Sequence, residues 1–192
     1  MSRKHIMVDL ETLSSADNAL VVSIGAIEFD PNTGDLGKQF YTVVKPGDQQ
    51  HLGRDVDANT VMWWLGQSDD ARRALYDPKH KPLGPGQALL QFHDFWKGVG
   101  KKSYFWSHAT FDSVVLGNLY KAYMLKPPWH YRDVVDIRTM VMLSPKELDT
   151  YEARVGLTHH NALDDAIYQA GYISKIWQHL KGEPSECQKT GS

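Results

Sequence analysis

The sequence predicts an α/β fold in which helices flank a mixed, five-stranded sheet whose first three strands are antiparallel. Three short apolar segments follow one another between residues 5 and 44. Helical patterns then alternate with two further apolar segments, which is typical of α/β domains. The chain has 192 residues, of which 42% are hydrophobic, enough for the core of one domain.

The first three strands are expected at residues 5–8, 21–30 and 40–44. Each segment is rich in Val, Ile or aromatic residues, which favour strands. Residues 31–34 (Pro-Asn-Thr-Gly) supply a tight turn between the second and third strands, so we expect an antiparallel meander. The first strand is expected at the centre of the sheet, because its apolar run is interrupted least.

Helices are expected wherever apolar residues recur at helical spacing after capping residues such as Asp57 and Ser68. Pro, Gly and Lys at 79–86 predict a loop. We expect one domain over residues 1–182 and a polar, disordered tail at 183–192. The expected helices cover residues 61–65, 68–76, 87–97, 112–123, 138–143 and 161–180, with a helical turn at 144–147, and the last two strands cover 103–107 and 134–137.

The overall charge argues against a protein that attracts nucleic acid through general basicity. The formal net charge is -2, so a nucleic acid would need a local site or a bound cation. The single cysteine, Cys187, gives no disulfide framework, and no apolar run is long enough for a membrane span or a signal peptide. We therefore expect a cytoplasmic protein with no membrane partner.

Two carboxylates follow the first apolar run. Asp9 and Glu11 are two residues apart, so on a strand they point to the same face. Their like charges repel, and burying them costs free energy unless a cation neutralises them. Oxygen ligands suit Mg²⁺ or Mn²⁺. These two residues alone leave a second interpretation open, in which both are surface carboxylates on a half-exposed strand.

Two later segments add acidic residues and a histidine. Asp112 begins a helix directly after a strand, where a carboxylate is either a capping group or a ligand. Near the start of the last helix, His159 could pair with Asp164, or His160 with Asp165. Helix geometry favours the second pair, because Asp165 shares a face with the alanines of the apolar stripe. His160 would then reach over the same site from the preceding loop.

Four carboxylates and one histidine match the needs of two-metal phosphoryl hydrolysis. In that chemistry, oxygen ligands hold two cations about 3.5–4 Å apart. A neutral histidine can accept the proton of the attacking water, because its pKa lies near working pH.

The motifs that carry these residues resemble those of the DEDDh 3'-to-5' exonucleases, a superfamily with an RNase H-like fold. The matching segments are residues 9–12 (Asp-Leu-Glu-Thr), 111–112 (Phe-Asp) and 160–166. Residues 63–64, 131–133 and 136–139 are most similar to small bacterial and phage exonucleases typified by a mycobacterial 3'-to-5' exoribonuclease. The resemblance implies a metal-dependent exonuclease that releases nucleoside 5'-monophosphates from single-stranded or 3'-overhanging RNA or DNA.

The resemblance also implies residue roles. Two Mg²⁺ or Mn²⁺ ions would bind to Asp9, Glu11, Asp112 and Asp165, and His160 would be the general base. The 3'-terminal nucleotide would be held at Thr12 and Leu13, with Leu13 against its base. Many relatives carry an asparagine in the second motif that is absent here, so Ser107 or His108 would take its place. The substrate-binding set would further include Trp63, Trp64 and Phe111.

Adjacent tryptophans on a helix cannot both face the same way, so we expect one of Trp63 and Trp64 in the core and the other on a substrate base. The low net charge predicts few phosphate contacts and a non-processive enzyme. The alternatives are a nucleic-acid-binding or partner module with weak catalysis, against which the complete motif set argues, and a phosphatase acting on small nucleotides. The choice between RNA and DNA and the formation of a homodimer stay open.

Overall fold

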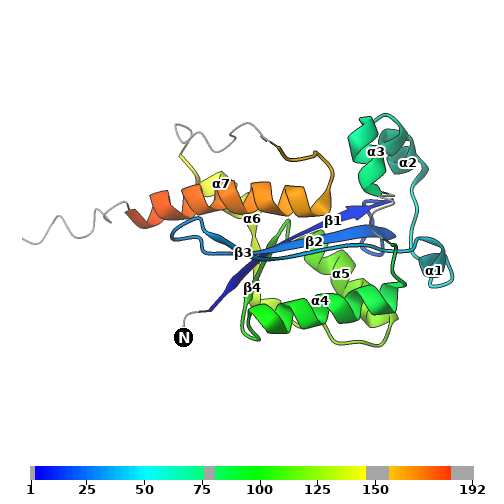
Figure 1. Ribbon diagram of the computed structural model, residues 1–192, viewed down its shortest axis with the longest axis horizontal. Coiled ribbons are helices and arrows are strands. Elements are labelled where there is room, and N and C mark those ends of the chain that lie inside the picture. Colours follow the sequence, from blue (N-terminus) through cyan, green and yellow to red (C-terminus); the bar gives the residue numbers. More distant parts are fainter. Residues whose placement is uncertain (1–2, 76–80, 146–155, 183–192) are drawn as a thin grey trace, which may run out of the picture.

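The computed structural model describes residues 3–75, 81–145 and 156–182. A five-stranded sheet with the strand order β3-β2-β1-β4-β5 lies between two layers of helices (Figure 1). The strands are β1 (His5–Thr12), β2 (Val21–Phe29), β3 (Leu36–Val43), β4 (Tyr104–Ser107) and β5 (Val134–Asp136). The helices are α1 (Gly47–Gln50), α2 (Ala58–Leu65), α3 (Asp69–Leu75), α4 (Pro85–Val99), α5 (Asp112–Ala122), the 3₁₀ turn η1 (Tyr131–Asp133), α6 (Ile137–Leu143) and α7 (Ala162–Gly182).

The sheet is mixed, as predicted. β1 pairs antiparallel with β2, and β2 pairs antiparallel with β3. β4 is parallel to both β1 and β5, and β1 is the central strand, which confirms the predicted order of the first three strands. Because parallel strands end at the same edge of a sheet, the carboxyl ends of β1, β4 and β5 meet there. This edge lies beside α2 and α3 in Figure 1.

Several boundaries differ from the prediction. β1 continues through the acidic residues to Thr12, because β2 pairs with it along this length. β3 begins at Leu36 rather than at residue 40. α4 begins at Pro85, within the predicted loop, because a proline in the first turn lacks only an N–H that would have no helical partner. α1 and η1 were not predicted. The expected tail and residues 146–147 of the expected helical turn lie outside the described residues.

The alternation of side chains along β1 divides the core in two. Ile6 and Val8 pack with residues of α4 and α5, whereas Met7 packs with residues of α7. The side chains of Asp9 and Glu11 lie on the same face of β1 as Met7 and therefore point toward the layer of α7. Figure 1 shows α7 on one side of the sheet and α4 and α5 on the other.

The N-terminus of α7 lies very close to β2. A Cβ atom at Gly25 would be 2.1 Å from the carbonyl carbon of Ala162, so only glycine fits this position. This close approach brings the first turn of α7 over the strand that carries the acidic residues. Among the described helices, none combines the length and apolar character required to cross a membrane.

Candidate active site

Four buried carboxylates gather at the carboxyl edge of the central strands. Asp9 and Glu11 belong to β1, Asp112 is the first residue of α5, and Asp165 lies in the first turn of α7. All four side chains are buried, and Asp112 is only 2% exposed. Three elements that are distant in the sequence thus supply four acidic groups to one place.

The acidic residues form two groups, each with one histidine. Possible ligand atoms of Asp9, His108 and Asp112 lie within 4.8 Å of one another. Those of Glu11, His160 and Asp165 lie within the same limit. Because Asp9 and Glu11 share a face of β1, the two groups are neighbours. All the residues predicted as metal ligands, and the predicted general base, are therefore brought together.

Burial dominates the electrostatics of Asp9 and Asp112. It raises the pKa of Asp9 well above its ordinary value, and the negative charges of Asp112, Glu11 and Asp165 raise it further. It also raises the pKa of Asp112 to about 7, although the hydrogen bonds that this carboxylate accepts from backbone N–H groups lower the pKa. Buried like charges are stable only when they are protonated or neutralised by cations. A set of carboxylate oxygens in this state fits Mg²⁺ or Mn²⁺.

His108 and Arg138 complete the first group. The backbone N–H of His108 donates to Asp112 Oδ2 at 3.0 Å, and the Nδ1 atom of His108 lies 3.8 Å from the same oxygen. Burial lowers the pKa of His108, and the charge of Arg138 lowers it further, so the ring is neutral at pH 7. Arg138 is exposed at the start of α6, and its charge also lowers the pKa of Asp112. The sequence suggested neither a ligand position for His108 nor a role for Arg138.

The loop before α7 holds His160 in an unusual conformation. His160 has a positive φ of 61° and donates its backbone N–H to Asp165 Oδ2 at 3.1 Å. Asp164 instead accepts a hydrogen bond from the backbone N–H of Thr158 at 2.8 Å, as a capping group does. The ring of Trp63 meets the ring of His160 edge-on, with 4.8 Å between the centroids. His159 is exposed, so the geometry favours the pair His160 and Asp165.

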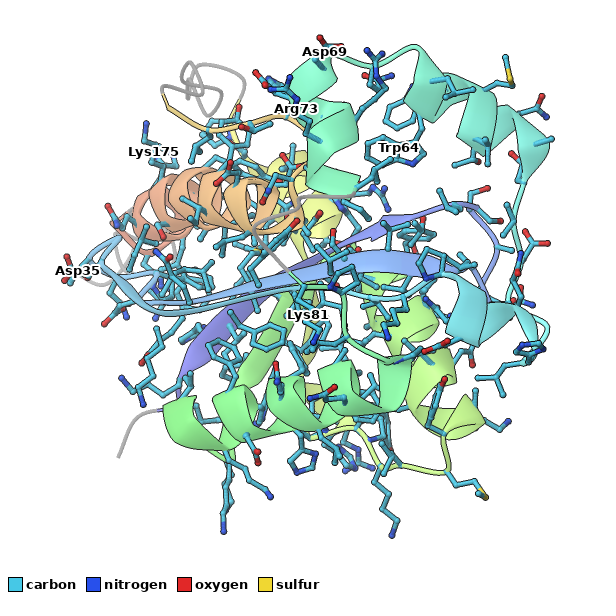
Figure 2. The ribbon with its side chains drawn as sticks, turned by 45° about the vertical axis from the view of Figure 1, so that its right-hand side comes forward. Asp35, Trp64, Asp69, Arg73, Lys81 and Lys175 are labelled. Carbon is cyan, nitrogen blue, oxygen red and sulfur yellow. The ribbon has the colours of Figure 1, made fainter. Side chains whose placement is uncertain are left out.

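The two tryptophans of α2 point in different directions, as helix geometry predicts. Trp64 is 4% exposed, and its indole N–H donates to the carbonyl of Thr12 at 2.9 Å. Figure 2 shows Trp64 on the inner side of α2, directed toward the sheet. Trp63 is 47% exposed and is free to contact a ligand.

A pocket of about 220 Å³ lies between α2 and the end of β1 and is lined by residues of both elements. Its lining includes the predicted residues Thr12, Trp63, Trp64 and Phe111, but not Leu13. The chain turns away after Thr12, where the N–H of Leu13 donates to the carbonyl of Leu20 at 3.0 Å. The lining residues that were not predicted to bind substrate are Leu10, Glu11, Ser14, Ser15 and Thr60.

Ser107 lies on the other face of the sheet from the carboxylates. Its neighbour Trp106 packs on the α7 side of the sheet, so Ser107 points to the opposite side from the carboxylates. Ser107 is also fully buried. The predicted contact between Ser107 and substrate has no support in this geometry and stays a prediction.

Gln169 touches the acidic cluster and was missed. It lies one turn after Asp165 on α7 and donates its side-chain N–H to Asp9 Oδ1 at 2.7 Å. The spacing of four residues from Asp165 is a signal that could have revealed it, because such residues share a helix face.

Comparison with known proteins identifies the family. A family model described as the 3'-5' exoribonuclease Rv2179c-like domain matches residues 4–177. The chain belongs to this family. The match to the Rv2179c-like domain confirms the predicted relationship to small 3'-to-5' exonucleases of the DEDDh superfamily.

One relative of this Rv2179c-like domain is the exodeoxyribonuclease of Enterobacteria phage T4, which is 25% identical over 162 residues. That alignment covers 76% of the chain and 62% of the relative, so the chain spans less than two thirds of the phage protein.

Solved structures support the predicted fold. Exonuclease I of E. coli in complex with a dT13 oligonucleotide superposes with a TM-score of 0.62 at 16% identity, covering 98% of this chain and 42% of that chain. Its complex with a dA16 oligonucleotide has a TM-score of 0.62 at 14% identity, covering 98% and 45% of the two chains. At these identities the likeness shows the fold, which is RNase H-like as predicted.

Proposed function

We propose that this chain is a metal-dependent 3'-to-5' exonuclease that releases nucleoside 5'-monophosphates from single-stranded or 3'-overhanging nucleic acid by a two-metal mechanism. The convergence of four buried carboxylates from β1, α5 and α7 beside a pocket carries this proposal. The family description names an exoribonuclease, and the phage relative is an exodeoxyribonuclease. Both RNA and DNA therefore remain candidate substrates.

The metal ligands in this proposal are Asp9, Glu11, Asp112 and Asp165, and His108 lies where it could join Asp9 and Asp112. When bound, two Mg²⁺ or Mn²⁺ ions would supply the positive charge that favours attack on the phosphate and stabilises the leaving oxygen. The carboxylates would hold this charge in a buried site, where electrostatic interactions are stronger than in bulk water.

His160 accepts the proton in this proposal. The attacking water gives a proton to the His160 ring, and its oxygen forms a bond to the terminal phosphorus. The bond from phosphorus to the 3' oxygen of the preceding nucleotide breaks, and that oxygen leaves with the electron pair and is then protonated. The edge contact with Trp63 and the backbone bond to Asp165 hold His160 toward the acidic groups.

The pocket holds the 3'-terminal nucleotide in this proposal. The exposed face of Trp63 stacks on its base, a contact worth roughly 1–3 kcal/mol in single-strand binding proteins. Leu10 and Phe111 contact the base in place of Leu13, and Thr12 lies beside the sugar. Arg138, a cation next to Asp112 and His108, contacts a substrate phosphate. A cytoplasmic location and a homodimeric state stay predictions.

Matched RNA and DNA strands labelled at the 5' end, incubated with Mg²⁺ or Mn²⁺, test this function. We expect a ladder that shortens from the 3' end, with nucleoside 5'-monophosphates as products, and no ladder with the Asp9→Ala variant. Internal cleavage would contradict the exonuclease proposal. Binding of a strand without hydrolysis under either metal would support the binding-module alternative instead.

A further inference from the structure

Gln169 and Asp9 form a buried hydrogen bond between α7 and β1. The donor and the acceptor are 2.7 Å apart, and the two residues are 5% and 8% exposed. The amide N–H of Gln169 is the donor and Asp9 Oδ1 is the acceptor, an arrangement that suits the ionised carboxylate because that form only accepts hydrogen bonds. Within the acidic cluster, this contact favours the charged form of Asp9 without adding a further charge.

The other end of the same amide has no partner. Gln169 Oε1 is buried and accepts no hydrogen bond from any described residue. Leaving a buried acceptor unsatisfied costs about 1–3 kcal/mol. Its helical neighbours Ala166, Ala170 and Ile173 are buried apolar residues, so methionine or leucine would fit this surface without that cost. Packing alone therefore does not explain a glutamine at this position.

We infer that Gln169 is a positioning residue that fixes the carboxylate of Asp9 for cation binding. The inference rests on the proposed metal site. The amide occupies one lone pair of Oδ1 and restrains the rotation of the carboxylate, while the remaining lone pairs stay available to a cation. Residues that hold metal ligands in this way typically change metal affinity or activity 10–100-fold when they are replaced.

The test measures Mn²⁺ binding by isothermal titration calorimetry in the absence of nucleic acid. Gln169→Met removes the donor and keeps an unbranched side chain of similar length. Gln178→Met is the matched control, because Gln178 lies on the same helix and donates to the carbonyl of Pro31, remote from the acidic cluster. We expect Gln169→Met to bind Mn²⁺ roughly 10–100-fold more weakly and Gln178→Met to bind like the wild type.

Kinetics add a readout that a loss of folding would not produce. We expect the Mn²⁺ concentration for half-maximal hydrolysis to rise in Gln169→Met, while kcat at saturating Mn²⁺ recovers. Circular dichroism of the metal-free proteins checks the fold, and Gln169→Leu is the second variant if Gln169→Met does not fold.

The outcomes separate this inference from the proposed function. Wild-type affinity in a folded Gln169→Met variant would overturn the inference and leave the exonuclease proposal intact. Unfolding of both Gln169 variants where Gln178→Met is folded would assign Gln169 to stability and would also overturn it. No Mn²⁺ binding by the wild type would refute the metal site itself.

Discussion

At the scale of single residues, the buried carboxylates oppose folding until a cation or a proton neutralises them. Asp112 shows this most clearly, because burial raises its pKa from 3.8 to about 7. The folded protein therefore keeps a proton that the unfolded chain releases between these two pH values. By linkage, the free energy of unfolding of the metal-free protein falls as the pH rises from about 4 to about 7.

Asp112→Asn should remove the part of this pH dependence that Asp112 contributes. A pKa shift from 3.8 to about 7 corresponds to at most about 4 kcal/mol, so the metal-free variant should be more stable than the wild type at pH 8 and similar at pH 4. Urea denaturation in EDTA at several pH values measures the difference. Equal slopes of stability against pH in the two proteins would contradict the assignment of this titration to Asp112. We also expect the variant to lose hydrolysis.

His160→Ala should lower kcat by about 10²–10⁴-fold, the usual contribution of a general base. His159→Ala is the control, because His159 is exposed and lies outside the acidic groups. We expect the control to keep wild-type activity. Mn²⁺ titration of His160→Ala shows whether metal binding survives. Loss of Mn²⁺ binding would indicate that His160 is a metal ligand. Loss of activity in His159→Ala alone would show that the site uses His159 with Asp164 rather than His160 with Asp165.

At the scale of elements, the approach of α7 to β2 places Asp165 over β1. Gly25→Ala should move the N-terminus of α7, because the added Cβ would lie 2.1 Å from the carbonyl carbon of Ala162. We expect a loss of about 1–3 kcal/mol from overpacking together with weaker Mn²⁺ binding. Gly171→Ala on the same helix has open space around its Cβ and should gain about 0.5–1 kcal/mol. Thermal denaturation should show a lower melting temperature for Gly25→Ala and a higher one for Gly171→Ala than for the wild type.

The strands and long helices could be predicted because their signals are local. The apolar runs of β1 and β2 and the alanine stripe of α7 are visible in the sequence. α1 could not be predicted, because this four-residue helix is anchored by a distant contact. The side chain of Gln49 exchanges hydrogen bonds with the backbone N–H and carbonyl of Val21.

The same difference between local and distant signals explains which residues of the candidate site could be predicted. Asp9, Glu11 and Asp165 were found from spacing on one strand and one helix, and the order of the motifs tied them together. Helical spacing could place Gln169 on the same face of α7 as Asp165, but its bond to Asp9 joins residues 160 positions apart, so no local pattern predicts that partner. The face of β4 on which Ser107 lies could not be predicted, because its position in the motif says nothing about that face.

At the scale of the whole molecule, the net charge of -2 means that binding depends on local cations. Fluorescence anisotropy with His160→Ala and a labelled single strand in Mn²⁺ measures this dependence. We expect a shallow fall of log affinity with log salt, because each phosphate contact on a single strand adds only about 0.7 to the slope. Arg138→Ala should reduce the slope by about 0.7, the value of one phosphate contact. Arg73→Ala, on α3, should leave the slope unchanged. A steep slope in His160→Ala with Arg138 intact would indicate a long, basic binding surface instead.

The left-handed backbone at His160 has a consequence for the history of the chain. A residue with a side chain pays about 1–2 kcal/mol for this conformation, which glycine adopts freely. His160→Gly should therefore unfold at a higher temperature than His160→Ala in metal-free buffer, although both lack the imidazole. Selection for stability alone would favour glycine at this position, so a histidine here fits the role that we propose for its side chain.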